Sequence, residues 1–228
     1  MTVKLHTVGE DALMLYLGNS ADEQTLARVQ AAVTAIEHAL GSELVDLVPS
    51  YASVLILYDP LRSERLQISR RVRAALDALQ VQPAATARRV VLPVYYAAES
   101  GADLESLAAR AGLSSDELIA LHTAPAYRVY AIGFAPGFAY LGEVDERIAA
   151  PRLATPRAAV PRGSVAIADR QTAVYPAESP GGWNLIGRCP VPMFDPDAQP
   201  CMPVAVGDSV RFESIDRERY LALGGELS

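Results

Sequence analysis

The stretch YRVYAIGFAPGFAYLG, residues 127–142, joins a run of β-branched and aromatic residues to a break rich in glycine and proline. The first half has the composition of a strand, and Pro136-Gly137 is a typical turn dipeptide. Similar short runs recur in SVAIA, TAVY and SVRFESI, and twelve of the 16 prolines lie after residue 120. Short strands separated by such turns indicate a β-sandwich or β-barrel.

The first eighty or so residues have a different pattern. Two strand-like runs precede a helix that opens with a capping box at residues 20–23 and ends at Gly41. The runs ELVDLV and SVLILY then lead into a second helix, predicted over residues 63–80. Apolar residues recur every three or four positions in both helices: Leu26, Val29, Val33, Ile36, Leu40, Ile68, Val72, Leu76 and Leu79. The order ββαββα predicts a small antiparallel sheet with both helices on one face.

A stretch of small and polar residues, VQPAAT at 81–86, breaks this pattern and predicts a domain boundary. The predicted domains are residues 1–85 and 86–228. The second opens with the strand RRVVLPVYY and continues with two short helices, one from Asp103 to about Gly112 and one capped by a box at residues 114–117. No helical pattern is evident after His122.

Charge and hydropathy exclude several classes of function. The net charge of -7 repels nucleic-acid phosphates, and the longest apolar run of the first half, SVLILY, is too short to span a membrane. No export signal is evident, which favours a cytoplasmic protein. Cys189 and Cys201 lack metal-ligand spacing and are interpreted as free thiols, and we expect no metal site.

Common catalytic motifs are absent from the chain. The sequence has no GxxxxGK[ST] phosphate loop, no GxGxxG, no GxSxG and no HExxH, so we expect no cofactor of its own. His122 is the one histidine near the unusual segments. It could act in catalysis, or it could cap the end of its helix and pack against Tyr127.

Aromatic residues and glycines suggest a shaped surface. Phe134, Phe138 and Tyr140 have even spacing, so in an extended chain they share one face, which is either core or a pocket wall. In SPGGWNLIGRCP, residues 179–190, two glycines precede the chain's only tryptophan, Trp183. Those glycines permit positive φ and close approach, and the indole offers a flat contact; a tight turn pinned by a core tryptophan is the alternative.

The segment PRLATPRAAVPRG repeats Pro-Arg at five-residue intervals, with arginines at 152, 157 and 162. An odd spacing turns successive side chains to opposite faces of a strand, so local geometry does not build a three-arginine anion site. One or two of these arginines could still bind a carboxylate or phosphate, and solvated loop arginines are the alternative.

These segments carry a family resemblance. Residues 121–142, 151–188 and 206–212 resemble the bacterial family that contains the B-type subunit of 5-oxoprolinase, allophanate hydrolase subunit 1 and the sporulation-kinase inhibitor KipI. The start of the chain, with YASVLILYDP, is similar to the amino-terminal domain of that family. Cys189 and Glu143 depart from it, standing where threonine and glycine are usual. The resemblance implies an α+β chain, with a small ferredoxin-like α/β domain followed by a cyclophilin-like β-barrel.

The resemblance also implies an activity and partners. An oxoprolinase subunit of this kind works with a carboxyltransferase-like partner of the C type and with a protein of the A type. Together they open 5-oxo-L-proline to L-glutamate at the expense of ATP, and the single subunit is expected to be inactive. The alternatives are a KipI-type inhibitor of a histidine kinase, a subunit related to allophanate hydrolase or urea carboxylase and, by fold analogy alone, a prolyl isomerase.

The predicted site is a groove that is completed by a partner protein. Its expected floor is Gly181, Gly182 and Trp183. The residues expected to flank it and to bind substrate or partner are Phe134, Pro136, Gly137, Phe138, Tyr140, Ser179 and Asn184. The residues expected to act on an amide or carboxylate are His122, Arg128, Gln171 and Arg188. The alternative is that such polar residues satisfy turns or pair with acids.

Overall fold

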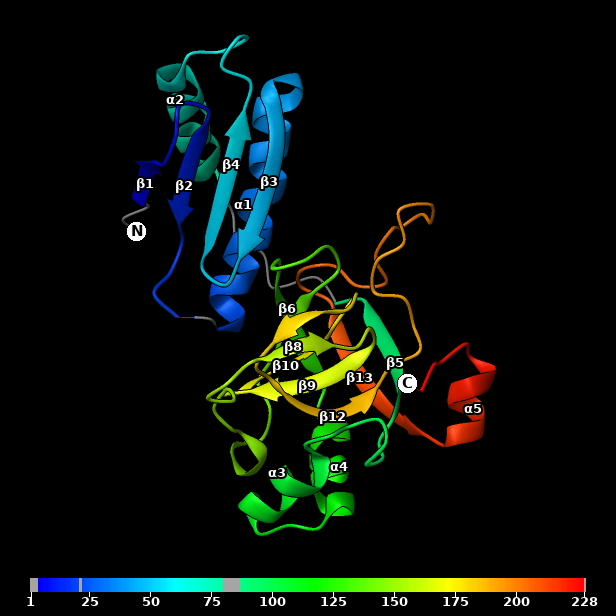
Figure 1. Ribbon diagram of the computed structural model, residues 1–228. Coiled ribbons are helices and arrows are strands. Elements are labelled where there is room, and N and C mark those ends of the chain that lie inside the picture. The colour runs from blue at the N-terminus through cyan, green and yellow to red at the C-terminus, as the bar shows by residue number, and fades with distance from the viewer. Residues whose placement is uncertain (1–3, 21, 80–86, 228) are drawn as a thin grey trace. The chain divides into compact units, whose positions relative to one another are not determined.

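The computed structural model describes residues 4–20, 22–79 and 87–227, and its contacts divide the chain into two compact units, Met1–Ala87 and Arg88–Ser228 (Figure 1). The predicted boundary at residues 81–86 lies outside the described residues. Each unit has its own hydrophobic core, and the two are described separately.

The first unit is a four-stranded antiparallel sheet with two helices. The sheet order is β1-β2-β4-β3, with α1 and α2 on one face (Figure 1). The elements are β1 (Lys4–Thr7), β2 (Ala12–Tyr16), α1 (Glu23–Leu40), the short 3-10 helix η1 (Gly41–Glu43), β3 (Leu44–Ser50), β4 (Ser53–Tyr58) and α2 (Arg65–Asp77). The predicted order ββαββα is confirmed.

The core of this unit follows the two periodicities of the sequence. Alternate residues of β4, Val54, Ile56 and Tyr58, are buried, as a sheet with one covered face requires. The helical stripe meets them, with Val29 and Ile36 fully buried on α1. Burial of each such side chain contributes about 1.5–3 kcal/mol to folding.

The helix ends differ from the prediction in two places. Asp22, and not Ser20, is the N-cap of α1, because its carboxylate accepts a hydrogen bond from the Thr25 amide at 2.7 Å. The Ser20 hydroxyl donates to that carboxylate instead. The second helix ends at Asp77, so Leu79 lies beyond the helical stripe.

The second unit is a closed seven-stranded barrel. Its strand order is β10-β7-β6-β13-β5-β12-β9, and β10 pairs with β9 to close it. The strands are β5 (Arg89–Tyr95), β6 (Tyr127–Ile132), β7 (Ala139–Gly142), β9 (Ser164–Ala168), β10 (Gln171–Val174), β12 (Asn184–Arg188) and β13 (Ser209–Ile215). The predicted α+β chain with a carboxy-terminal barrel is confirmed.

Helices and a small outer sheet complete the barrel unit. The helices are α3 (Leu104–Ala111), α4 (Ser115–Thr123), the 3-10 helix η2 (Glu146–Ile148) and α5 (Arg217–Ala222). The outer sheet pairs β8 (Arg157–Val160) with β11 (Ser179–Gly181). The prediction of no helix after His122 is wrong, because α5 exists. Its six residues are too few to show a helical period, although Asp216 caps it by accepting from the Arg219 amide at 2.8 Å.

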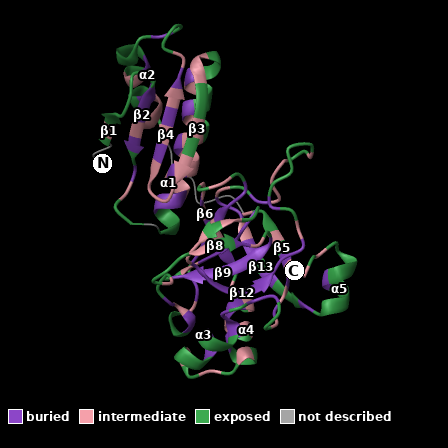
Figure 2. Cartoon of the chain, in the orientation of Figure 1, coloured by how far each residue is buried: buried purple, intermediate pink, exposed green. Residues whose placement is uncertain are grey.

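Two apolar layers hold this unit together. The barrel interior is filled by side chains such as Val129, Leu141 and Ile167, and the strands of the barrel are largely buried in Figure 2. A second cluster lies outside the barrel wall, where Val160 of β8 packs with Ala166 of β9. The residues of β9 therefore face two cores alternately, and all five are buried.

Candidate functional site

The outer face of strands β6, β7 and β10 brings together polar side chains that are far apart in the sequence. Arg128 on β6 is the register partner of Gly142 on β7, and Gly142 is also the partner of Gln171 on β10. Register partners in a sheet point to the same face, and adjacent strands lie about 4.8 Å apart. Arg128 and Gln171 therefore flank Gly142 on one face, with Cα atoms about 10 Å apart.

A β-bulge shapes this face. Val129 pairs with Leu141, but Ala131 pairs with Tyr140, so Tyr130 is an extra residue in β6. The bulge lets Val129 and Ile132 both pack on the barrel interior, three positions apart, where strict alternation would turn one of them outward. Tyr130, which follows the inward-facing Val129, points to the outer face. A Cβ added at Gly142 would lie 3.1 Å from its ring, so the ring lies over the glycine.

Aromatic rings border the face. The Tyr140 ring lies 5.0 Å from the Phe138 ring and 6.1 Å from the indole of Trp183, between centroids. Phe134 continues the series with an edge contact to Phe138 at 5.2 Å. Phe138 is buried, whereas Phe134 is 64% exposed and has a φ of 72°, a conformation costly for a bulky residue. The rings of Phe134, Phe138 and Tyr140 therefore lie next to one another. Phe138 belongs to the core, whereas Phe134 faces solvent.

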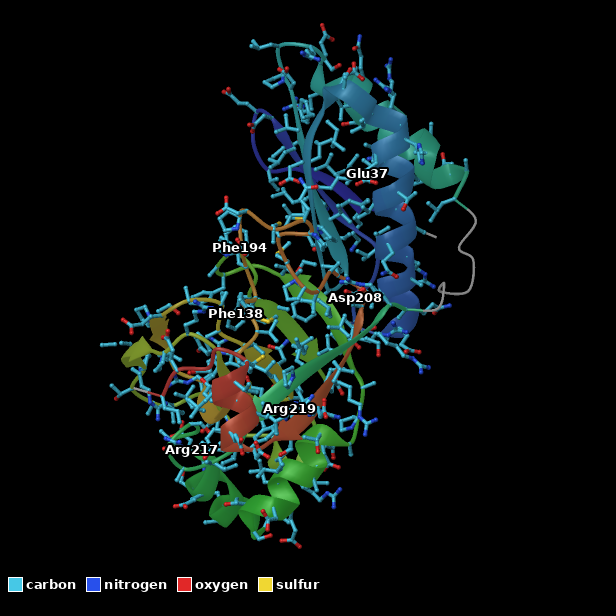
Figure 3. All side chains as sticks on the ribbon, turned by 90° about the vertical axis from the view of Figure 1, so that its right-hand side faces the viewer. Glu37, Phe138, Phe194, Asp208, Arg217 and Arg219 are labelled. Carbon is cyan, nitrogen blue, oxygen red and sulfur yellow. The ribbon has the colours of Figure 1, made fainter. Side chains whose placement is uncertain are left out.

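The turn that presents Phe134 depends on Gly137. Its φ is 83°, and an added Cβ would lie 2.3 Å from the carbonyl oxygen of Met193. The loop that carries Met193 and Phe194 therefore packs directly on the turn; Phe138 and Phe194 are labelled in Figure 3. Pro136, beside Gly137, is exposed.

Trp183 does not form an open groove floor. The indole is 4% exposed and packs edge-on against Phe138 at 5.5 Å between centroids, in the cluster outside the barrel wall. The Arg152 guanidinium lies over it at 5.8 Å. Gly181 is required by close packing, since a Cβ there would lie 2.3 Å from the Tyr175 hydroxyl, and neither Gly181 nor Gly182 has positive φ. The structure therefore supports the alternative interpretation, in which Trp183 is a core residue that pins a tight turn.

His122 lies inside the barrel and has no exposed surface. Its Nδ1 lies 2.8 Å from the Tyr96 hydroxyl, and its Nε2 lies 2.9 Å from Oγ1 of Thr172. The imidazole stacks on Phe212 at 4.7 Å, and burial lowers its pKa from 6.5 to about 3. With both ring nitrogens partnered and no solvent access, His122 is a neutral structural residue, so the predicted catalytic role is corrected.

Asn184 is also a structural residue. It is fully buried, its Oδ1 accepts from Nη2 of Arg110 at 2.8 Å, and its Nδ2 donates to the carbonyls of Pro151 and Ile167 at 3.0 Å. Its predicted contact with a ligand or partner is therefore corrected. Ser179 lies on β11, and its hydroxyl is buried without a partner among the described residues.

Arg188 lies far from Arg128 and Gln171. On β9, Ser164 is the register partner of Arg188, and Ala168 is the partner of Gln171. Four residues of strand separate the two positions by about 13 Å along the strand. Arg188 instead lines a separate cavity of about 240 Å³ together with Arg162, Glu178 and Tyr220.

The three Pro-Arg arginines have three different environments, as the odd spacing suggested. Arg152 lies over Trp183, Arg162 lines the Arg188 cavity, and Arg157 forms an ion pair with Asp103 at 2.7 Å. The other oxygen of Asp103 accepts from the Leu185 amide at 2.7 Å, so this pair joins α3 to β12. No common anion clamp forms.

Sequence reasoning missed Tyr130 and Tyr220. A bulge depends on the pairing of two strands, so no local pattern reveals Tyr130. Tyr220 sits on the unpredicted helix α5, and Asp216 before it was the available signal. Cys189 is buried and its pKa is raised to about 12 by burial, so its thiol is no ready nucleophile.

Two searches of the described residues are negative. Among residues 4–20, 22–79 and 87–227, no group of three or more His, Cys, Asp or Glu side chains could hold a metal ion. Within the same ranges, no helix has the length and apolar character needed to cross a membrane.

A small α/β unit followed along the chain by a closed barrel is a combination of folds that also occurs in other proteins. The urea carboxylase of Kluyveromyces lactis contains the same fold, with a TM-score of 0.75 at 16% sequence identity over 96% of this chain and 22% of that one. At that identity the likeness concerns the fold alone. The chain therefore has the fold of carboxyltransferase-type domains.

The family follows from the sequence. The family model described as "Carboxyltransferase domain, subdomain C and D" matches residues 3–204, and the chain belongs to this family. The 5-oxoprolinase B subunit of Bacillus subtilis (strain 168) is 37% identical over 97% of this chain and 98% of its own length. The solved structure of TTHA0988 is 39% identical over 90% of this chain, with a TM-score of 0.80. This chain spans about two fifths of that protein, since it covers 40% of its length.

Proposed function

We propose that the protein is the B-type component of a cytoplasmic, ATP-dependent 5-oxoprolinase, a hydrolase that opens 5-oxo-L-proline to L-glutamate. The proposal draws on the 37% identity to the Bacillus subtilis protein over nearly the full length of both chains. In this reaction the lactam C–N bond breaks, water supplies the oxygen of the new carboxylate, and the ring nitrogen becomes the amine of glutamate. Cleavage of ATP drives the step.

The face around Gly142 has the chemistry to hold such a substrate. 5-Oxoproline carries one carboxylate and one planar amide. A guanidinium such as that of Arg128 suits a carboxylate, and a carboxamide such as that of Gln171 can both donate to the lactam carbonyl and accept from its N–H. One Nη of Arg128 is held by the carbonyl of Gly207 at 3.0 Å, which fixes the side chain. The alignment of Arg128, Gly142 and Gln171 is the observation that carries the assignment.

In this proposal the chain binds and orients, and partners supply the ATP-dependent chemistry. Its sequence lacks a phosphate loop, so ATP is assigned to the complex formed with a carboxyltransferase-like protein of the C type and a protein of the A type. Phe134 is the candidate docking residue, because it is 64% exposed and adopts a positive φ that is unfavourable for a bulky side chain.

The test is a reconstituted complex. The chain is co-expressed with its candidate A-type and C-type partners, and release of glutamate and ADP from 5-oxo-L-proline is measured. We expect no turnover by the chain alone, and at least tenfold lower kcat/KM for Arg128→Ala and for Gln171→Ala. Arg73→Ala, at an exposed arginine of α2 in the first unit, is the matched control and should retain wild-type turnover.

Two results would contradict the proposal. Wild-type turnover in both site variants would remove the Gly142 face from the mechanism. A purified complex that releases no glutamate from 5-oxo-L-proline would remove the assigned reaction. Allophanate and urea are included as substrates, because a role in an allophanate hydrolase or a urea carboxylase-related enzyme is the alternative activity.

A further inference from the structure

Two loops of the barrel unit meet and bring two exposed phenylalanines close together. Residues 133–138 join β6 to β7, and residues 189–208 join β12 to β13. An added Cβ at Gly137 would lie 2.9 Å from Cβ of Phe194, which Figure 3 labels. The loops are therefore in direct contact, and Phe194 packs on the turn that follows Phe134 in the chain.

The shorter loop contains a well-defined turn. The Phe138 amide donates to the Ala135 carbonyl at 3.0 Å, and Gly137 has a φ of 83°. With Pro136 before that glycine, this is the pattern of a type II turn. The Phe134 ring makes an edge contact with the buried ring of Phe138 at 5.2 Å between centroids. Phe134 is therefore positioned by its own loop.

The longer loop is anchored by buried residues. Met193 and Val204 are each 1% exposed and belong to the barrel core. Between them, the Asp195 amide donates to the Cys201 carbonyl at 2.8 Å, which closes the loop. The loop is the orange segment between β12 and β13 in Figure 1, and most of it is exposed or half-buried in Figure 2. Phe194 directly follows the anchor Met193, so core packing of its neighbour fixes its place.

The exposure of these two rings is unusual. Phe134 is 64% exposed and Phe194 is 38% exposed, which together amounts to on the order of 200 Å² of aromatic surface. Phe134 also has a φ of 72°, and the only other described non-glycine residue with a positive φ is Asp169, a type that tolerates it better. Such backbone outliers concentrate at functional sites. The area is less than the roughly 800 Å² that each partner buries in a standard interface, but it suits the central anchor of one.

The charge around the two rings is negative. Asp195 and Asp197 are exposed, and residues 133–138 and 189–203 contain no lysine or arginine. Neither aspartate forms an ion pair within the described part of the chain. Arg88, which donates to a carbonyl at the end of the longer loop, is itself ion-paired. The carboxylates are therefore available to a partner.

This negative charge narrows what can cover the rings. Aspartates repel nucleic-acid phosphates and anionic lipid headgroups. A second copy of the chain, in a two-fold symmetric contact through this surface, would bring the same aspartates together, and each copy has a net charge of -7. The surface fits a different protein, one with an apolar pocket for the rings and lysine or arginine at the pocket rim.

We propose that Phe134, Phe194 and the turn carrying Asp195 and Asp197 form a docking surface for a protein whose apolar pocket is rimmed by basic residues. The choice of the C-type protein as this partner rests on the function proposed above. The two rings enter the pocket and slow dissociation, whereas the two aspartates attract the basic rim and speed association.

The test measures binding of the full chain to the C-type partner by surface plasmon resonance. Phe194→Ala keeps the Cβ that packs on Gly137, and it should weaken binding at least tenfold through faster dissociation. Asp197→Lys should slow association at least threefold and reduce the loss of affinity between about 50 and 500 mM NaCl. The matched controls are Leu61→Ala, at a residue 95% exposed, and Glu37→Lys, at an exposed position on α1 (Figure 3). Both should bind as the wild type does.

Circular dichroism checks the fold of each variant, and Asp197→Lys, in the exposed part of the loop, decides the test if Phe194→Ala does not fold. The proposal is overturned if the wild-type chain does not bind the C-type partner, or if the folded variants bind it as tightly as the wild type. It is also overturned if the chain binds phosphatidylserine vesicles, or dimerises in light scattering, and loses this property in Phe194→Ala.

Glutamate release is measured on the same preparations, so that the docking surface and the assigned reaction are tested separately. Turnover of 5-oxo-L-proline by a complex in which both variants bind normally would leave the reaction standing and remove the docking surface. Loss of binding in both variants, with no glutamate released by the wild-type complex, would leave the docking surface standing and remove the reaction.

Discussion

The interior and the outer wall of the barrel both carry polar side chains, but their hydrogen bonding differs. Inside, His122 has a partner at each ring nitrogen, and nothing remains for a ligand. Outside, Nε of Arg188 and the Ser164 hydroxyl have no hydrogen-bond partner among the described residues, and Arg128 and Gln171 flank a glycine. Burial alone therefore does not mark a functional group. The distinction is whether its hydrogen bonds are already complete.

The largest expected change in stability comes from a substitution in the barrel interior. His122→Ala removes a stacked ring and leaves the hydroxyls of Tyr96 and Thr172 without partners, so we expect a loss of about 3–5 kcal/mol in the free energy of unfolding. Urea denaturation followed by circular dichroism measures it. A loss below 1 kcal/mol would show that the interior network does not support the barrel.

The same histidine predicts a dependence of stability on pH. Its pKa is about 3 in the folded protein and about 6.5 in the unfolded chain, so the unfolded chain binds the proton first as pH falls. Stability is fully present above pH 6.5 and decreases towards pH 3, by up to about 1.4 kcal/mol per pH unit from this group. The measurement is the pH dependence of urea unfolding in the wild type and in His122→Gln, which should lack this slope. Equal slopes would contradict the prediction.

A smaller effect is expected at the outer face. In Gly142→Ala the new methyl group meets the Tyr130 ring at 3.1 Å, and the ring can shift. We expect a stability change of about 1 kcal/mol or less, with severalfold lower turnover by the reconstituted complex. Thermal unfolding and glutamate release measure the two quantities. Unchanged turnover would place the substrate elsewhere.

The smallest stability effect, with the opposite sign, is expected at Phe134. Phe134→Gly relieves a positive φ at an exposed position, which should stabilise the chain by about 0.5–1 kcal/mol. The same change removes the proposed docking ring, so affinity for the C-type partner should fall about tenfold in surface plasmon resonance. Destabilisation together with unchanged affinity would show that the ring serves the fold instead.

The sequence predicts what depends on local periodicity and fails where distant strands must be aligned. The sequence predicts the elements of the first unit correctly, because the apolar stripe of α1 and the alternating burial along β4 are patterns within a few neighbouring residues. The partners Gly142 and Gln171 are 29 positions apart, and Tyr130 is a bulge only relative to β7. His122 meets Thr172 fifty residues away, so its burial could not be read from its own helix.

The most direct test compares neighbouring residues on β10. Gln171 faces outward beside Gly142, while the next residue, Thr172, is buried against His122. Glutamate release from 5-oxo-L-proline, measured per folded molecule of the reconstituted complex, should fall at least tenfold in Gln171→Ala and stay near wild type in Thr172→Val. Thr172→Val should instead lose about 1–2 kcal/mol of stability. Full activity in Gln171→Ala, with activity lost in folded Thr172→Val, would contradict the assignment of function to the outer wall.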